Sequence, residues 1–106
     1  MILEDLRVIY FIRPEYLAED VKRALLRSGL SVKVEKGDCW MVLLGRGNAG
    51  ETVKARLEWS RKTLRELKVL GRNIYVTEIK VQAKGDEAFL KAFKRRLEVS
   101  LLRCLG

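Results

Sequence analysis

The side chains with the clearest capacity for chemistry in this 106-residue sequence are its lysines and arginines. They number 22, against 14 aspartates and glutamates, which gives a formal net charge of +8. Residues 1–45 carry seven basic and seven acidic side chains, residues 46–72 carry eight and three, and residues 73–106 carry seven and four. A concentrated cationic surface favours binding to a phosphate backbone, because each phosphate that is neutralised releases its counterions.

A long helix that begins after Gly50 and ends at Gly71 is predicted to present most of this charge. At about 100° per residue, Lys54, Arg61, Arg65 and Lys68 fall within one stripe, beside a core-facing stripe of leucines and valine. Cations at the helix entrance and on the last helix extend the surface. The predicted nucleic-acid-binding residues are Arg46, Lys54, Arg56, Arg61, Lys62, Arg65, Lys68, Lys94, Arg95 and Arg96.

The alternative interpretation of this charge is a solvated helix face. Glu58 can pair with Lys54 and Lys62 at i, i+4 spacing, as on many thermostable helices. Only three side-chain amides accompany a charged fraction of 34%, a composition typical of proteins from hot environments. The concentration of the imbalance in one half of the chain favours the nucleic-acid interpretation.

Three aromatic residues bear on how a nucleic acid would be held. Trp59 falls on the side of the predicted helix away from the core, where it could stack on a base, pack under the C-terminal helix or lie in a dimer interface. Tyr10 and Trp40 lie on strands expected to be central, and could face an open sheet surface.

The sequence Gly45-Arg-Gly-Asn-Ala-Gly50 fits the GxGxxG pattern and is expected to join a strand to the long helix. Backbone amides at such a junction can hold a phosphate, with Arg46 adding charge. Three interpretations follow: a tight connection, a contact to an RNA phosphate, or a small nucleotide site. No acidic residue follows at the spacing that a dinucleotide fold uses to bind ribose.

The sequence lacks the groups that most catalytic and metal centres use. It has no histidine, which excludes a Ser–His–Asp triad, a Cys–His nucleophile and a histidine-bound metal. Cys39 and Cys104 each lie among apolar residues and are expected to be two buried thiols, with a disulfide as the alternative. We therefore expect no catalytic residue, no metal, no cofactor and no enzymatic activity.

Apolar periodicity divides the first half of the chain at its glycines and its single proline. Residues 6–12 are β-branched and aromatic and predict a strand. Pro14 suits the first turn of a helix that Gly29 ends. Alternation then predicts a strand over residues 30–35, a hairpin turn at residues 36–38 and a central strand over residues 39–44.

Beyond the long helix, residues 73–84 predict a strand whose apolar phase shifts between Val76 and Ile79, which indicates a bulge. Asp86 is placed to cap a last helix. One side of that helix carries Phe89, Leu90, Phe93, Leu97, Leu101 and Cys104. The order βαββαβ predicts a ferredoxin-like α+β domain with a four-stranded antiparallel sheet and an additional C-terminal helix. That helix could cover the open face of the sheet or contact a partner.

A single domain over residues 1–106 is expected, because the length supports one core. No segment reaches the roughly 20 apolar residues of a membrane span, and the first residues do not resemble a signal peptide. A cytoplasmic location without membrane contact is therefore expected.

Three segments of the sequence resemble the small RRM-like protein subunit of archaeal ribonuclease P. They are Arg7-Val-Ile-Tyr-Phe-Ile12, a helix beginning Val53-Lys-Ala-Arg-Leu57, and Ile74-Tyr-Val-Thr-Glu-Ile-Lys-Val81. The resemblance covers about two thirds of the chain by element order; where that family has a Val-Ser-Gly turn, this chain has Val81-Gln-Ala-Lys-Gly85. It implies an RNA-binding, non-catalytic subunit of a ribonucleoprotein that processes precursor tRNA, with other protein subunits as partners.

The sequence therefore predicts an accessory protein that binds nucleic acid, with RNA favoured over DNA. The first alternative is a ferredoxin-like protein-interaction module or homodimer that pairs through sheet edges or the last helix. The second is a small phosphate- or nucleotide-binding protein built on the loop of residues 45–50.

Overall fold

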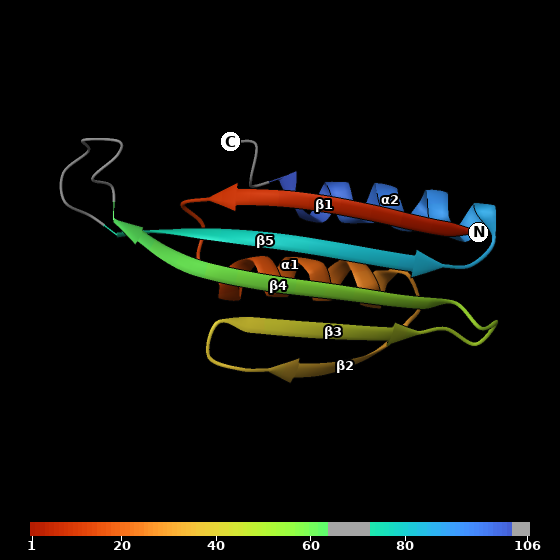
Figure 1. The fold of residues 1–106 in the computed structure, drawn as a ribbon. Coiled ribbons are helices and arrows are strands. Elements are labelled where there is room, and N and C mark those ends of the chain that lie inside the picture. The colour runs from red at the N-terminus through yellow and green to blue at the C-terminus, as the bar shows by residue number, and fades with distance from the viewer. Residues whose placement is uncertain (64–72, 103–106) are drawn as a thin grey trace.

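The chain forms an antiparallel sheet with two helices packed against one face (Figure 1). The computed structural model describes the backbone of residues 1–63 and 73–102, and the side chains of residues 1–60 and 75–102. Within these ranges the elements are β1 (Ile2–Tyr10), α1 (Pro14–Arg27), β2 (Ser31–Lys36), β3 (Trp40–Arg46), β4 (Thr52–Thr63), β5 (Asn73–Lys84) and α2 (Glu87–Ser100). The order β1-β5-β4-β3-β2 is a four-stranded meander with β1 added beside β5.

The predicted ferredoxin-like fold with four strands is wrong, because residues 52–63 form strand β4 where a helix was expected. Four inward side chains of β4 alternate with polar ones, which is the period of a strand. They are Val53, Ala55, Leu57 and Trp59. The helical stripe depended on Leu64 and Leu67, which lie outside the described residues together with the expected helix end at Gly71.

The hydrophobic core lies between the helix layer and the facing side of the sheet. Ala55 on β4 is fully buried between Leu43 on β3 and Val81 on β5, its Cα partners on the two neighbouring strands. Helices α1 and α2 contact each other beneath these strands. The central side chains of the core are Leu17, Val21, Leu25, Leu43, Val53, Leu57, Ile79, Val81, Phe93 and Leu97.

Helix α1 confirms the prediction made from Pro14 and Gly29. Proline occupies the first helical position, where its missing N–H costs no hydrogen bond. Gly29 follows the helix with φ of +79°, a left-handed conformation that glycine adopts without strain. Its N–H donates to the carbonyl of Leu26 at 3.0 Å, which terminates the helix.

Strands β2 and β3 also confirm their predictions, joined by a turn in which the N–H of Gly37 donates to the carbonyl of Trp40 at 3.0 Å. Cys39 in this turn is a free, exposed thiol, so its predicted burial is wrong. The turn directs its side chain away from the core. Cys104 lies outside the described residues.

Strand β5 has the predicted bounds but not the predicted bulge. Its pairing with β1 and with β4 is continuous, without a skipped residue on either side. The apolar phase shift arises because Thr77 occupies an inward, fully buried position, while Val76 faces the other way and stays half-buried. The shift in apolar phase therefore reflects a buried polar residue in a regular strand, and not a bulge.

Helix α2 begins as predicted at the Asp86 cap, whose Oδ1 accepts from the N–H of Phe89 at 2.7 Å. Leu90, Phe93 and Leu97 are its buried residues, as its apolar stripe predicts. The helix packs on the same face of the sheet as α1, and Figure 1 shows both helices behind the strands. No helix or strand of the described residues therefore covers the opposite face of the sheet.

Replacing Asp86 with alanine should lower the free energy of unfolding by about 1 kcal/mol, because the first turn of α2 loses its side-chain acceptor. Urea denaturation followed by circular dichroism measures the change. Asp86→Asn is the matched control, since an asparagine retains an acceptor oxygen at the cap. Equal destabilisation by both substitutions would contradict a capping role.

Candidate nucleic-acid interface

The uncovered face of the sheet, here called the open face, is formed by alternate residues of all five strands. The register places the even-numbered residues of β1, β3, β4 and β5 on this face, because their odd-numbered neighbours contact the helices. Val42 is the only one of these even-numbered residues on β3 that is buried, at 6% exposure. The rest of the open face is accessible to a ligand to differing degrees.

The open face has an apolar edge and a cationic centre. Strand β1 contributes Ile2, Leu6, Val8 and Tyr10, whose exposed fractions lie between 49% and 62%. The neighbouring strands contribute exposed cations in columns beside it: Lys80 and Lys84 on β5, Lys54 and Arg56 on β4, and Arg46 on β3. An apolar strip beside a row of cations suits a ligand that has apolar rings on one side and negative charge on the other.

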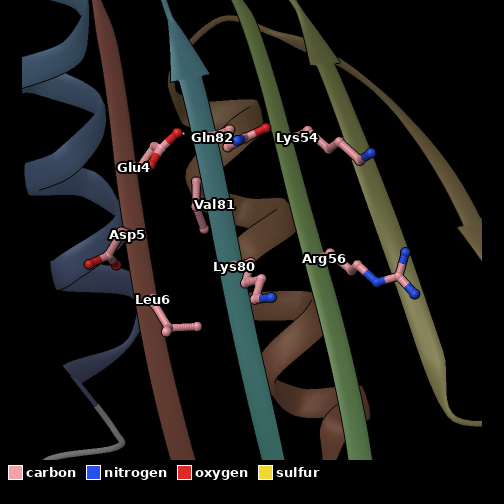
Figure 2. Close-up of a pocket in the computed structure, with 8 residues that line it drawn as sticks. All are labelled: Glu4, Asp5, Leu6, Lys54, Arg56, Lys80, Val81 and Gln82. Atoms are coloured by element: carbon pink, nitrogen blue, oxygen red, sulfur yellow. Dashed lines mark hydrogen bonds between the residues drawn. The ribbon is translucent and has the colours of Figure 1, made fainter.

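A hollow of about 430 Å³ lies over β5 in the middle of this face (Figure 2). Its lining residues are Glu4, Asp5, Leu6, Lys54, Arg56, Lys80, Val81 and Gln82. The Gln82 amide donates to Oε1 of Glu4 at 3.3 Å, which joins β5 to β1 across the hollow. A second hollow of about 350 Å³ on the same face includes Val8, Tyr10, Val76 and Glu78 in its lining.

The cations of the open face differ in how far their charge is compensated. Arg56 pairs with Glu58 and also places its guanidinium 5.9 Å from the centre of the Trp40 ring. Lys80 lies 3.5 Å from a carboxylate oxygen of Glu78. Lys54 makes no ion pair with any described residue, and Figure 2 shows its side chain extending toward β3. Ion pairs between exposed side chains are weak, so a phosphate can compete for these cations.

Strand β1 ends in an exposed aromatic pair, and the backbone of the second residue of this pair is strained. Tyr10 and Phe11 have ring centroids 6.5 Å apart and exposed fractions of 52% and 68%. Phe11 has φ of +73°, a left-handed conformation that costs a side-chain-bearing residue about 1–2 kcal/mol. Its N–H donates to the carbonyl of Tyr75 at 3.0 Å, which holds the strained residue in place. Strain of this kind is concentrated at functional sites.

The residues predicted from sequence to bind nucleic acid do not all lie on one surface of the structure. Arg46, Lys54 and Arg56 lie together on the open face. Lys94, Arg95 and Arg96 are exposed on α2, in the helix layer behind the sheet. Arg61 and Lys62 belong to β4, with side chains outside the described set, and Arg65 and Lys68 lie outside the described residues entirely.

Trp59 does not occupy the exposed helical position that its predicted stacking role assumed. It is an inward residue of β4, half-buried, and it packs against the hydrophobic core. Of the aromatic residues discussed above, Tyr10 and Trp40 do face the open side, as was anticipated for central strands. Tyr10, however, lies on the edge strand β1.

Sequence analysis missed the contribution of β1 and β5 to this surface, namely Glu4, Leu6, Lys80, Gln82 and Lys84. A signal for the last three was present, because they alternate with the buried residues Ile79, Val81 and Ala83. That alternation places all three on one face of a strand. No sequence signal indicated that β1 would pair beside β5 and bring Glu4 to Gln82.

The loop of residues 47–51 joins β3 to β4 as a hairpin connection, so the predicted strand-to-helix junction is wrong. The N–H of Gly47 donates to the carbonyl of Glu51 at 2.9 Å, and Gly50 has φ of +87°. The glycines therefore serve a reversal of the chain. The expected phosphate site required a helix N-terminus after the loop, and strand β4 stands in its place.

Comparisons with known proteins assign the chain to no family: no family model matches the sequence, and no curated protein matches it either. Among the described residues, neither helix has the length and apolar character needed to cross a membrane. Within the same residues, no three acidic, cysteine or histidine side chains form a group suited to a metal ion.

Proposed function

We propose that this protein binds nucleic acid, and RNA in particular, through the open face of the sheet. One observation carries the proposal: both helices cover the other face, and among the described residues the open face carries six exposed cations, Lys33 on β2 in addition to the five named above, together with a central hollow. The protein would neutralise and position RNA without breaking bonds. The resemblance to a ribonuclease P subunit supports the choice of RNA only in part, because the segment it treats as a helix, Val53 to Leu57, belongs to β4.

The physical basis is the exchange of small counterions for lysine and arginine side chains along a phosphate backbone. Side chains two residues apart on a strand lie about 6.8 Å from each other, so Lys54 and Arg56 form a short row of charge. Lys80 extends the row sideways, because it is the Cα partner of Arg56 on β5. Such a surface should bind with a strong salt dependence and limited sequence preference.

Neutralising Lys54 and Arg56 together, as Lys54→Gln and Arg56→Gln, should weaken RNA binding and reduce its salt dependence. If each residue contacts one phosphate, the slope of log K against log salt should fall by about 1.4 on a single strand. Fluorescence anisotropy at several salt concentrations measures both quantities, with a tRNA-like RNA, a duplex DNA and a single strand compared side by side. Unchanged affinity and an unchanged salt slope would show that the open face is not the binding site.

A second candidate function is supported by the edge strand β1. This strand is nine residues long, pairs with β5 on one side only, and exposes four apolar side chains. Long apolar edges are uncommon in monomers, because they invite pairing with another chain. Strand β2 at the other edge is shorter and carries two lysines. Size-exclusion chromatography with light scattering tests self-association. A strict monomer would exclude a homodimer, so that only a different protein could pair with this edge.

A further inference from the structure

The central hollow has two unlike walls. On the β1 side stand the Glu4 carboxylate and the exposed Leu6 side chain, and on the β4 side stand Lys54 and Arg56. Figure 2 shows Glu4 directed toward Gln82, over the hollow, while Lys54 and Arg56 extend from β4 toward β3, so their charged ends lie beyond the β4 side of the hollow, away from Glu4. A ligand that fits this arrangement carries negative charge at one end and a hydrogen-bond donor with an apolar face at the other.

We propose that the hollow binds one unpaired nucleotide whose base carries an exocyclic amino group. The phosphate lies against Lys54 and Arg56, the base lies over Leu6, and the amino group donates to the Glu4 carboxylate. This inference rests on the proposed nucleic-acid function of the open face and names the class of nucleotide that the face selects.

The acceptor at Glu4 is held in position by its neighbour. The Gln82 Nε2 group donates to Oε1 at 3.3 Å, which leaves Oε2 available to a ligand. An ionised carboxylate accepts hydrogen bonds and donates none, so adenine and cytosine can satisfy it through their amino groups. Uracil presents a carbonyl oxygen at the corresponding position, which the carboxylate repels. The hollow should therefore discriminate between bases that are otherwise similar in size.

The nucleotide must be unpaired for this contact to form. In a duplex the exocyclic amino groups of adenine and cytosine are engaged in base pairs, and the base faces are stacked on their neighbours. An A-form RNA duplex also has a deep, narrow major groove that side chains do not reach. In a single strand the base face is free to lie on the apolar strip of β1, while the phosphate remains on the cationic side.

The test compares binding of the full chain to short oligoadenylate, oligocytidylate and oligouridylate at one salt concentration. Wild-type protein should bind the first two about tenfold more tightly than oligouridylate, the effect of one hydrogen bond to a charged group. Glu4→Gln should reduce this difference to less than about twofold, because an amide can also donate to the uracil carbonyl. Glu4→Ala is a second variant in which the acceptor is removed outright.

Glu35→Gln is the matched control, since Glu35 is also an exposed glutamate on the open side of the sheet. It removes the same charge and should leave the base preference unchanged. Salt-dependent binding without any base preference in the wild type would overturn the inference while leaving the proposed function intact. A preference that survives Glu4→Gln and Glu4→Ala would also overturn it. Absence of binding to every oligonucleotide would instead refute the proposed function.

Discussion

Replacing Ala55 with glutamate should destabilise the fold by more than about 3 kcal/mol, because it places a charged side chain in a dry core. Ala55 is fully buried at the centre of the sheet, between Leu43 and Val81 and above the helix layer. No room exists there for a larger side chain without displacing its neighbours. Thermal and urea denaturation measure the loss, which should be large enough to unfold a considerable fraction of the protein.

Arg56→Glu is the control for this substitution. It introduces the same side chain one residue further along β4, on the exposed open face and opposite Lys80. A glutamate there stays hydrated and can pair with that lysine, but the ion pair with Glu58 and the contact with the Trp40 ring are lost, so stability should fall by about 1 kcal/mol, well below the loss from Ala55→Glu. The helix expected from sequence predicts a different outcome, since Ala55 would then lie on its solvent side. A stable, folded Ala55→Glu protein would contradict the assignment of β4.

Reversing the charge at Lys54 and Arg56 together should lower the affinity for RNA by about 100-fold at moderate salt, because two contacts are lost and two repulsions are added. The substitutions are Lys54→Glu and Arg56→Glu, both at exposed positions of the open face. The variant should remain folded, since neither side chain contributes to the core. Anisotropy titrations with a single-stranded RNA measure the change.

Lys94→Glu with Arg95→Glu provides the comparison, because it makes the same change of charge in the helix layer. Long-range electrostatics should lower the affinity of this variant only a few-fold, and less as salt screens the interaction. If the α2 substitutions lowered the affinity more than the β4 substitutions, the binding site would lie in the helix layer. The two surfaces lie on opposite sides of the sheet, so the results separate them.

The sequence alone determined the elements whose signals are local. Pro14 and Gly29 marked the ends of α1, and Asp86 marked the start of α2, because caps and fixed backbone angles act within one turn. The bounds of β5 followed from its β-branched residues and the flanking glycines. The uneven distribution of charged residues along the chain was also evident without a structure, since it can be counted directly from the sequence.

Residues 52–63 were misassigned because two periods competed. Val53 and Leu57 are four residues apart, which satisfies a helix with period 3.6 and a strand with period 2 alike. Ala55 and Trp59 decide between them, since they are inward in a strand and outward in a helix. The local sequence alone does not distinguish these two periods. Pairing with β3 on one side and β5 on the other favours the strand.

The open face itself was decided by tertiary structure alone. Its cations come from β2, β3, β4 and β5, and its apolar strip comes from β1, which is distant in sequence from the strand it joins. The contact between Glu4 and Gln82 spans 78 residues, and no local rule places these side chains together. What the sequence determined by itself was a surplus of positive charge and the ends of single elements. Which charges share a surface depended on strand order, because only the packing of both helices on one face leaves the other face open.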